Sequence, residues 1–210
     1  MSQCSVYGCS GKHNARGFCM KHYCQMKRFG KILPRSLKDK NEMVIDGDIC
    51  RIKLYALSGE VKAETIIDAE DHAKVKNHKW ALQSNGYVTA KNKGKSIYLS
   101  ALVLGVNATI RSVVDHMDGD TLNNRKGNLR HCTTQQNFFN QCIRSNNTSG
   151  FKGVFWDKRL KKWRARIKIN YVGKHLGCFP TKEEAAVAYN QAAIENYGEF
   201  ARLNIIDMEG

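Results

Sequence analysis

The chain has 210 residues, with 34 lysines and arginines against 19 acidic residues, a formal net charge of +15 and a sequence pI near 9.5. Hydrophobic residues make up 42 %, which is enough for small cores, and no segment approaches the ~18 consecutive apolar residues of a membrane-spanning helix. The length allows one domain or two, and no membrane-spanning helix is expected.

The basic residues are unevenly distributed. Residues 1–43 hold nine basic and two acidic residues, residues 44–142 hold thirteen and ten, and residues 143–210 hold twelve and seven. The two flanks therefore carry most of the excess. Because phosphate neutralisation dominates nucleic-acid affinity, this pattern predicts two basic binding arms around a nearly balanced centre. Charge alone also allows a merely solvated basic surface.

The N-terminus starts with polar residues and cysteines, without the charged stretch and apolar run of a signal peptide. We therefore expect a cytoplasmic protein that is not secreted. In a reducing compartment, cysteines serve as metal ligands or remain free thiols. We expect small buried or half-buried side chains, not ligands, at the scattered Cys50, Cys132, Cys142 and Cys178.

Five candidate metal ligands lie early in the chain: Cys4, Cys9, Cys19, His22 and Cys24. Cys4-x4-Cys9, followed after nine residues by Cys19-x2-His22, is compatible with a tetrahedral structural zinc site. Cys24 is a rival for the fourth position, because Cys19-x4-Cys24 repeats the first spacing. So small a segment has too little apolar surface to fold alone, and the metal would supply the folding energy.

A basic tail follows this segment, and it is either a solvated linker or a contact to the DNA backbone. It contains Lys27, Arg28, Lys31, Arg35, Lys38 and Lys40.

Residues 44–110 are expected to form a small β-rich lead-in. Two β-branched runs flank the Ser58-Gly59-Glu60 turn and predict a hairpin. Asp68 can cap a helix over residues 69–78, and Trp80 is expected in the core rather than as a DNA wedge. The expected strands cover residues 49–57, 61–67, 80–83, 86–91 and 95–99.

Residues 113–140 hold the most informative pattern. An Asp-His pair, Asp115-His116, is followed 12 residues after the histidine by Asn128 and then by Asn137. This spacing resembles the HNH nuclease motif, in the variant in which asparagine replaces the last histidine. The resemblance extends to Asp118-Gly119-Asp120, Asn123-Asn124-Arg125, Asn128-Leu129-Arg130 and Gln136-Asn137.

The resemblance implies a ββα-metal fold and a role for each residue. His116 would be the general base, Asp115 and Asn137 would hold Mg²⁺ or another divalent cation, and Asn128 would tie the loop that positions the histidine. Cleavage of the P–O3′ bond would leave a 5′-phosphate and a 3′-hydroxyl. The segment 15–23 resembles the short zinc modules found in front of phage and bacterial HNH proteins, which implies His22 as the fourth zinc ligand.

The chemistry and the local sequence agree with these roles. Phosphodiester hydrolysis requires a base for water and a cation for developing charge. A hard ion accepts a carboxylate and an amide oxygen, and a histidine with an unperturbed pKa of ~6.5 can take a proton near neutral pH. We expect strands over 111–116 and 129–132, and a helix from Thr133 or Thr134 to residue 140. The competing interpretations are plain turn chemistry and a core histidine.

Residues 143–150 are polar and rich in turn-forming residues, and we interpret them as a linker. A different sequence pattern begins after them. Residues 151–204 resemble an AP2 domain, a DNA-binding module with a three-stranded antiparallel sheet and one helix, which is also found in HNH homing endonucleases. The resemblance rests on Lys152-Gly153-Val154, Trp163-Arg164-Ala165, Leu176-Gly177-Cys178-Phe179, Thr181–Tyr189, Gly198 and Ala201–Asn204.

Period-two alternation supports that architecture independently. Apolar and basic residues alternate over 163–170, which places a basic face opposite the core. Thr181 and Glu184 form a capping box before an alanine-rich helix. Plant AP2 domains have arginine where this chain has Phe155 and Asp157, so their base contacts do not transfer. The candidate DNA contacts are Lys152, Arg164, Arg166, Lys168 and Lys174, and a solvated charged face is the alternative.

The sequence thus predicts a modular α+β protein: a zinc module with basic tail (1–43), an HNH domain (44–142), a linker (143–150) and an AP2 domain (151–204). We expect a site-recognising, metal-dependent DNA endonuclease similar to phage-type homing endonucleases, acting in a bacterial or phage-infected cell. Its partner would be double-stranded DNA, bound as a monomer, with no membrane. The rival is a non-catalytic DNA-binding protein with a relic HNH fold.

Overall fold

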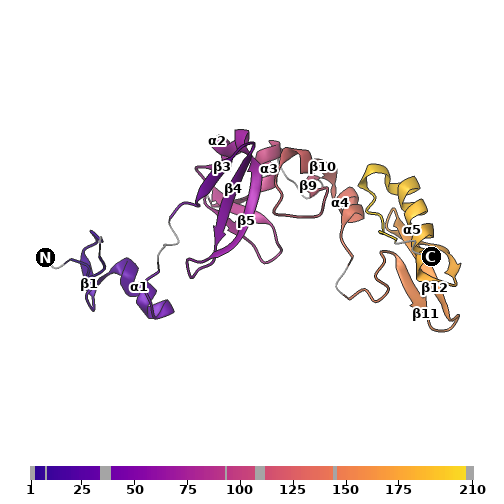
Figure 1. The fold of residues 1–210 in the computed structure, drawn as a ribbon, viewed down its shortest axis with the longest axis horizontal. Coiled ribbons are helices and arrows are strands. Elements are labelled where there is room, and N and C mark those ends of the chain that lie inside the picture. The colour runs from indigo at the N-terminus through magenta and orange to yellow at the C-terminus, as the bar shows by residue number, and fades with distance from the viewer. Residues whose placement is uncertain are drawn as a thin grey trace. The chain divides into compact units, whose positions relative to one another are not determined.

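The computed structural model describes residues 3–7, 9–33, 39–92, 94–106, 112–143 and 146–206. Strands and helices mix along the chain, consistent with the predicted α+β class (Figure 1). The chain forms two compact units: unit 1 comprises Met1–Gly105 with Thr121–Lys126, and unit 2 comprises Val106–Asp120 with Gly127–Gly210. These units cut across the domain boundaries expected from the sequence, which stay predictions.

The N-terminal segment is a small hairpin followed by a helix. Strands β1 (His13–Ala15) and β2 (Phe18–Cys19) pair antiparallel, and α1 covers Met20–Phe29. The helix ends at Gly30, whose left-handed φ of 67° suits glycine. Part of the expected basic tail is therefore helical.

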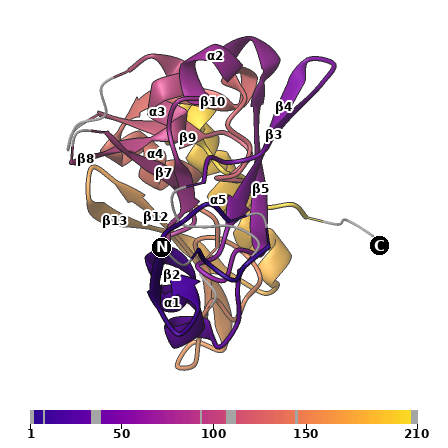
Figure 2. The same cartoon turned by 90° about the vertical axis from the view of Figure 1, so that its left-hand side faces the viewer.

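The first sheet of unit 1 has the order β3-β4-β5, with β3 at Met43–Asp46, β4 at Ile49–Tyr55 and β5 at Val61–Asp68 (Figure 2). The predicted hairpin is confirmed as β4–β5, and β3 adds an unexpected edge strand. The predicted helix after Asp68 is shorter than expected. It consists of a 3₁₀ turn, η1 (Ala69–Asp71), and α2 (His72–Val75).

The second sheet of unit 1 is formed by β6 (Trp80–Leu82), β7 (Val88–Asn92) and β8 (Lys95–Tyr98), followed by α3 (Leu99–Leu104). Trp80 is buried, as predicted, and its indole nitrogen donates to the carbonyl of Val75 at 3.1 Å.

Unit 2 begins with the expected hairpin and helix. Strands β9 (Ser112–His116) and β10 (Leu129–Thr133) pair antiparallel, a single 3₁₀ turn, η2 (Lys126–Asn128), precedes β10, and α4 covers Thr134–Asn140. Thr133 caps the helix, and with Gln136 it forms a reciprocal capping box.

Unit 2 continues with a three-stranded antiparallel sheet and a long helix. The strand order is β11 (Val154–Asp157), β12 (Lys162–Ile169) and β13 (Val172–Phe179). Helix α5 (Lys182–Tyr197) is capped by Thr181, as the sequence predicted, and the 3₁₀ turn η3 (Gly198–Phe200) follows it. The core between sheet and helix contains Val154, Ala165, Ile167, Ala185, Ala186, Tyr189 and Ala193.

The scattered cysteines are all free thiols. Cys50 and Cys132 are buried and Cys178 is half-buried, as expected, but Cys142 is exposed, contrary to the expectation. Within the part of the chain that the structure describes, no helix is both long and apolar enough to cross a bilayer.

Candidate active site and metal centres

Asp115 and His116 occupy the last two positions of β9 and are almost fully buried, with 3 % and 4 % of their surfaces exposed. The hairpin register places His116 opposite Leu129 and Asp115 opposite Arg130. Directly opposed residues share one face of a pair of strands. The acidic side chain of Asp115 and the basic side chain of Arg130 therefore meet on one face of the hairpin.

The carboxylate of Asp115 is held from two sides. Arg130 donates to Asp115 Oδ2 through Nε, at 2.8 Å, and its Nη2 lies 2.8 Å from the same oxygen. Asn140, at the end of α4, donates from Nδ2 to Asp115 Oδ1 at 3.0 Å. Two different elements thus fix the orientation of one carboxylate.

Asn140 also donates to the backbone carbonyl of His116 at 2.8 Å. The residue of α4 that contacts Asp115 is therefore Asn140, three positions after Asn137. Asn137 is half-buried and lines a cavity of about 170 Å³ together with Phe138, Lys168 and other side chains. The sequence identified the helix, but not Asn140.

Asn128 closes the loop that follows His116. Its Oδ1 accepts from the backbone nitrogen of Asp118 at 3.0 Å, and its Nδ2 donates to Asp118 Oδ1 at 2.8 Å. Its carbonyl accepts from the backbone nitrogen of Met117 at 2.9 Å. Three hydrogen bonds therefore fix the chain at the two positions after the histidine.

The middle of the same loop, Thr121–Lys126, belongs to unit 1. Asn124 is buried and donates to Thr65 Oγ1 on β5 at 2.9 Å. Arg125 donates from Nε to Asp68 at the end of β5 at 2.7 Å. Asn124 was expected to form a turn and Arg125 was named only as part of the motif; in the structure both dock the loop on strand β5.

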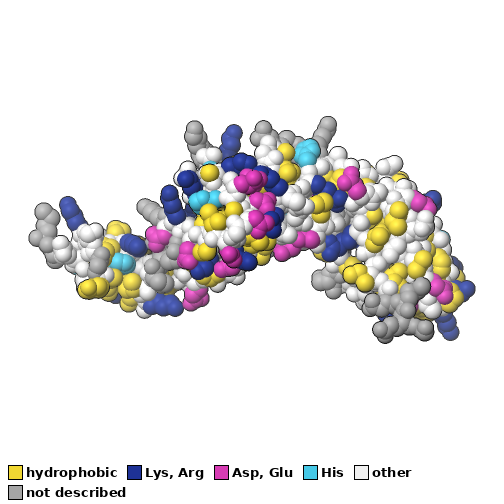
Figure 3. Space-filling view, turned by 45° about the horizontal axis from the view of Figure 1, so that its top comes forward, with side chains coloured by type: hydrophobic (Ala, Val, Ile, Leu, Met, Phe, Trp, Pro, Cys, Tyr) yellow, Lys and Arg dark blue, Asp and Glu magenta, His cyan; other side chains and the backbone are white. Residues whose placement is uncertain are grey.

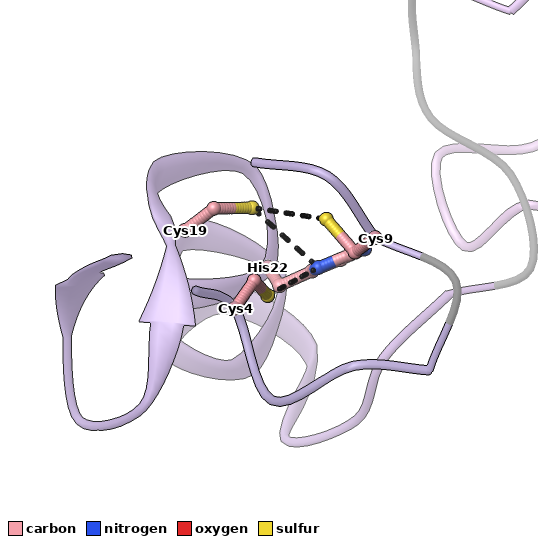
Figure 4. Close-up of side chains that lie close together, drawn as sticks. All are labelled: Cys4, Cys9, Cys19 and His22. Atoms are coloured by element: carbon pink, nitrogen blue, oxygen red, sulfur yellow. Dashed lines mark hydrogen bonds between the residues drawn. The ribbon is translucent and has the colours of Figure 1, made fainter. Parts of the chain in front are cut away.

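Four side chains of the N-terminal segment form a compact cluster, shown in Figure 4. The ligand atoms of Cys4, Cys9, Cys19 and His22 all lie within 4.8 Å of one another. Cys9 and Cys19 have their sulfurs 3.8 Å apart, and His22 Nδ1 lies 3.2 Å from Cys4 Sγ and 3.5 Å from Cys19 Sγ. Tetrahedral zinc with Zn–S of ~2.3 Å and Zn–N of ~2.05 Å requires ~3.8 Å between sulfurs and ~3.5 Å between sulfur and nitrogen.

Cys24 lies outside this cluster: it is exposed, and its sulfur contacts Met20 Sδ at 3.9 Å. The structure therefore gathers His22, and not Cys24, with the three other cysteines. Burial would raise the pKa of the Cys4 thiol, but hydrogen bonds from His22 and from the backbone outweigh it and lower that pKa to about 6. A thiolate is the form that binds zinc.

The outer face of the β11–β13 sheet carries three of the expected basic residues. Arg164, Arg166 and Lys168 alternate along β12 with the buried Ala165 and Ile167. Arg164 pairs with Asp157 at 3.1 Å. Lys168 Nζ lies 5.8 Å from the ring centroid of the exposed Tyr171. This face therefore combines cations with aromatic rings.

Lys174 and Lys152 lie elsewhere. The register sets Lys174 opposite Ile167, so it points to the other face of the sheet. Lys152 donates from Nζ to the carbonyls of Phe139 and Gln141, at 2.5 and 2.8 Å, at the end of α4. Burial lowers the pKa of its ammonium to about 8.

On the face drawn in Figure 3, lysine and arginine side chains occur in all parts of the chain, with acidic side chains between them. The described basic residues on this face do not gather in one patch.

Comparison with known proteins shows the family of the chain. The family model described as HNH endonuclease matches residues 106–138. An uncharacterized HNH endonuclease, L560, of Acanthamoeba polyphaga mimivirus is 36 % identical over 138 residues, which covers 63 % of this chain and 70 % of that protein. The chain belongs to the HNH endonuclease family. It is therefore a nuclease.

A second relative of this HNH endonuclease is Protein 3.8 of Escherichia phage T7, 33 % identical over 89 residues, or 42 % of this chain and 73 % of that protein. No solved structure matches the chain significantly. The matched segment 106–138 includes Asp115, His116, Asn128 and Asn137, and it ends just before Asn140.

Proposed function

We propose that this nuclease is a site-recognising, divalent-metal-dependent DNA endonuclease with His116 as the general base. The supporting observation is that His116 is buried at the end of β9 and directly follows Asp115, whose carboxylate is held in a fixed orientation. Histidine is the side chain that most readily accepts a proton from water near neutral pH. Asn128 supports this role by fixing the loop that follows the histidine.

The donor set at the hairpin fits a hard divalent cation. Asp115 at the end of β9 carries a carboxylate and Asn137 on α4 carries an amide oxygen, and Mg²⁺ prefers oxygen ligands. When bound, such an ion stabilises the charge that develops on the phosphate and the leaving oxygen. We assign the metal to Asp115 and Asn137. Asn140 then orients Asp115 from the next turn.

We further propose that Cys4, Cys9, Cys19 and His22 hold a structural zinc ion. The match between their spacing and tetrahedral geometry supports this. All four positions would be filled by protein side chains, and a closed site of this kind is structural rather than catalytic.

The third proposal concerns recognition of double-stranded DNA by the β11–β13 sheet, in the manner of an AP2 domain. Three antiparallel strands backed by one helix leave one face open, and this face presents Arg164, Arg166 and Lys168. A β-sheet face of this kind can enter the major groove. The enzyme would act there as a monomer.

The test is cleavage of plasmid or phage DNA with Mg²⁺, read on a denaturing gel. His116→Ala should lower the cleavage rate by roughly 10²–10⁴-fold and leave DNA affinity unchanged, because a general base contributes little to binding. Asp115→Ala should abolish cleavage. His131→Ala, on the exposed side of β10, is the matched control and should cut normally. A wild-type rate for His116→Ala would contradict the assignment, and an inactive wild type would favour the relic-fold alternative.

A further inference from the structure

Arg130 links Asp115 to the segment that follows helix α5. Its Nε and Nη2 engage Asp115 Oδ2, each at 2.8 Å. Its Nη1 donates to the backbone carbonyl of Glu199 at 2.7 Å and lies 4.0 Å from the Glu199 carboxylate. Only 14 % of the Arg130 side chain is exposed. One guanidinium therefore joins residues 84 positions apart.

The ring of Phe200 also packs against this guanidinium. The central carbon of Arg130 lies 4.0 Å from the Phe200 ring centroid, a close cation–π contact. The neighbouring Tyr197 stacks on Phe139 of α4, with ring centroids 3.7 Å apart and planes 9° from parallel. The end of α5 and the turn η3 therefore contact both strand β10 of the hairpin and the following helix α4. All of these elements belong to unit 2.

The hydrogen bonds of the Asp115 carboxylate show how Arg130 affects its two oxygens. An ionised carboxylate has about four acceptor sites, two on each oxygen. Arg130 occupies both sites on Oδ2, and Asn140 occupies one on Oδ1. Among the hydrogen bonds of the described residues, the remaining acceptor site lies on Oδ1, and this oxygen can therefore face a cation.

We propose that Arg130 is a positioning residue, seated by Glu199 and Phe200, that presents Asp115 Oδ1 to the metal. The active site of the nuclease is then incomplete without the turn after α5. This inference rests on the proposed function, because it takes Asp115 as a metal ligand. A guanidinium that acted only through its charge would repel a cation, so the two roles predict opposite effects of removing it.

The experiment measures Mn²⁺ affinity by titration calorimetry on the zinc-loaded full-length protein. Arg130→Gln removes the charge and the two-pronged contact, and Phe200→Leu keeps apolar volume but removes the ring face. Both variants should bind Mn²⁺ more weakly, by about threefold to tenfold, in the range of coupled neighbouring residues. The double variant should bind no more weakly than Arg130→Gln alone, because Phe200 acts through the guanidinium.

Phe155→Leu is the matched control. The guanidinium carbon of Arg164 lies 5.6 Å from the Phe155 ring centroid, so Phe155 also packs on an arginine, but among the described residues it does not contact the β9–β10 hairpin. It should leave Mn²⁺ affinity unchanged. Tighter binding by Arg130→Gln, unchanged binding by Phe200→Leu, or additive effects in the double variant would each overturn the inference. If the wild-type protein binds no Mn²⁺, the metal role of Asp115 in the proposed function fails instead, and the inference fails with it.

Discussion

The side-chain nitrogen of Asn140 lies 3.0 Å from Asp115 Oδ1 and 2.8 Å from the backbone carbonyl oxygen of His116. One amide on α4 thus fastens both residues at the end of β9, and it is 6 % exposed. Asn137, one turn earlier on the same helix, has a different environment, so the two asparagines can be separated by experiment.

Asn140→Ala should lower the free energy of unfolding by about 1–3 kcal/mol, because it leaves buried acceptors unsatisfied. Asn137→Ala should change it by less than about 0.5 kcal/mol, as is usual for a side chain with no buried hydrogen-bond partner among the described residues. The same change should weaken Mn²⁺ binding and slow cleavage. Urea denaturation and calorimetric titration measure the two effects. Equal stability of Asn140→Ala and wild type would contradict the first expectation.

Purified protein should contain one zinc ion per chain, measured by elemental analysis. Cys9→Ser and His22→Ala should lose it, because each removes one of four ligands. Cys24→Ser, at an exposed cysteine outside the cluster, is the control and should retain the metal. Retention by His22→Ala together with loss by Cys24→Ser would reverse our choice of the fourth ligand.

The ammonium of Lys152 should make stability depend on pH. Its pKa is lowered to about 8 in the folded chain, against an ordinary value of 10.5. Between these values the unfolded chain binds the proton and the folded chain does not, so the free energy of unfolding rises with pH. Below about pH 8 both the folded and the unfolded chain bind the proton, so Lys152 adds no pH dependence to the free energy of unfolding there. Urea denaturation of the wild type and of Lys152→Met at several pH values from 7 to about 9.5 isolates this dependence. If the unfolding free energies of the two proteins change with pH in parallel, the pKa of Lys152 is not lowered.

Arg166→Ala and Lys168→Ala should each weaken DNA binding. A lost phosphate contact lowers the slope of log affinity against log salt by about one, whereas a lost base contact costs ~1–3 kcal/mol at one sequence position. Binding is measured at several salt concentrations in the His116→Ala background, in which cleavage should be roughly 10²–10⁴-fold slower. Lys174→Ala, on the other face of the sheet, is the control of equal charge. Effects no larger than those of Lys174→Ala would mean that the basic face is solvated surface.

Elements with strong local signals could be predicted from the sequence. Thr133 and Thr181 mark two helix starts through capping residues, and both cap their helices in the structure. Alternation over 163–170 predicted strand β12 and its buried face. Helix α1 was missed because its basic residues were interpreted as part of a tail, although Gly30 at its end was a usable signal.

Contacts around the site depend on geometry that a sequence does not carry. Asn137 and Asn140 lie three residues apart, so both can fall on one side of a helix, and only the rotation of α4 decides which reaches Asp115. The pairing of Asp115 with Arg130 does follow from the hairpin register, and could have been found. The contact between Arg130 and Phe200 could not, because it joins distant segments.

The chain passes from one compact unit to the other at three places, because Thr121–Lys126 belongs to unit 1 while both flanking strands of the hairpin belong to unit 2. No single break point therefore separates two whole units. A recombination event near residue 105 would pair the Asn124 and Arg125 of one parent with the Thr65 and Asp68 of another. Among descendants of such exchanges, the loop and strand β5 should be inherited as a matched pair.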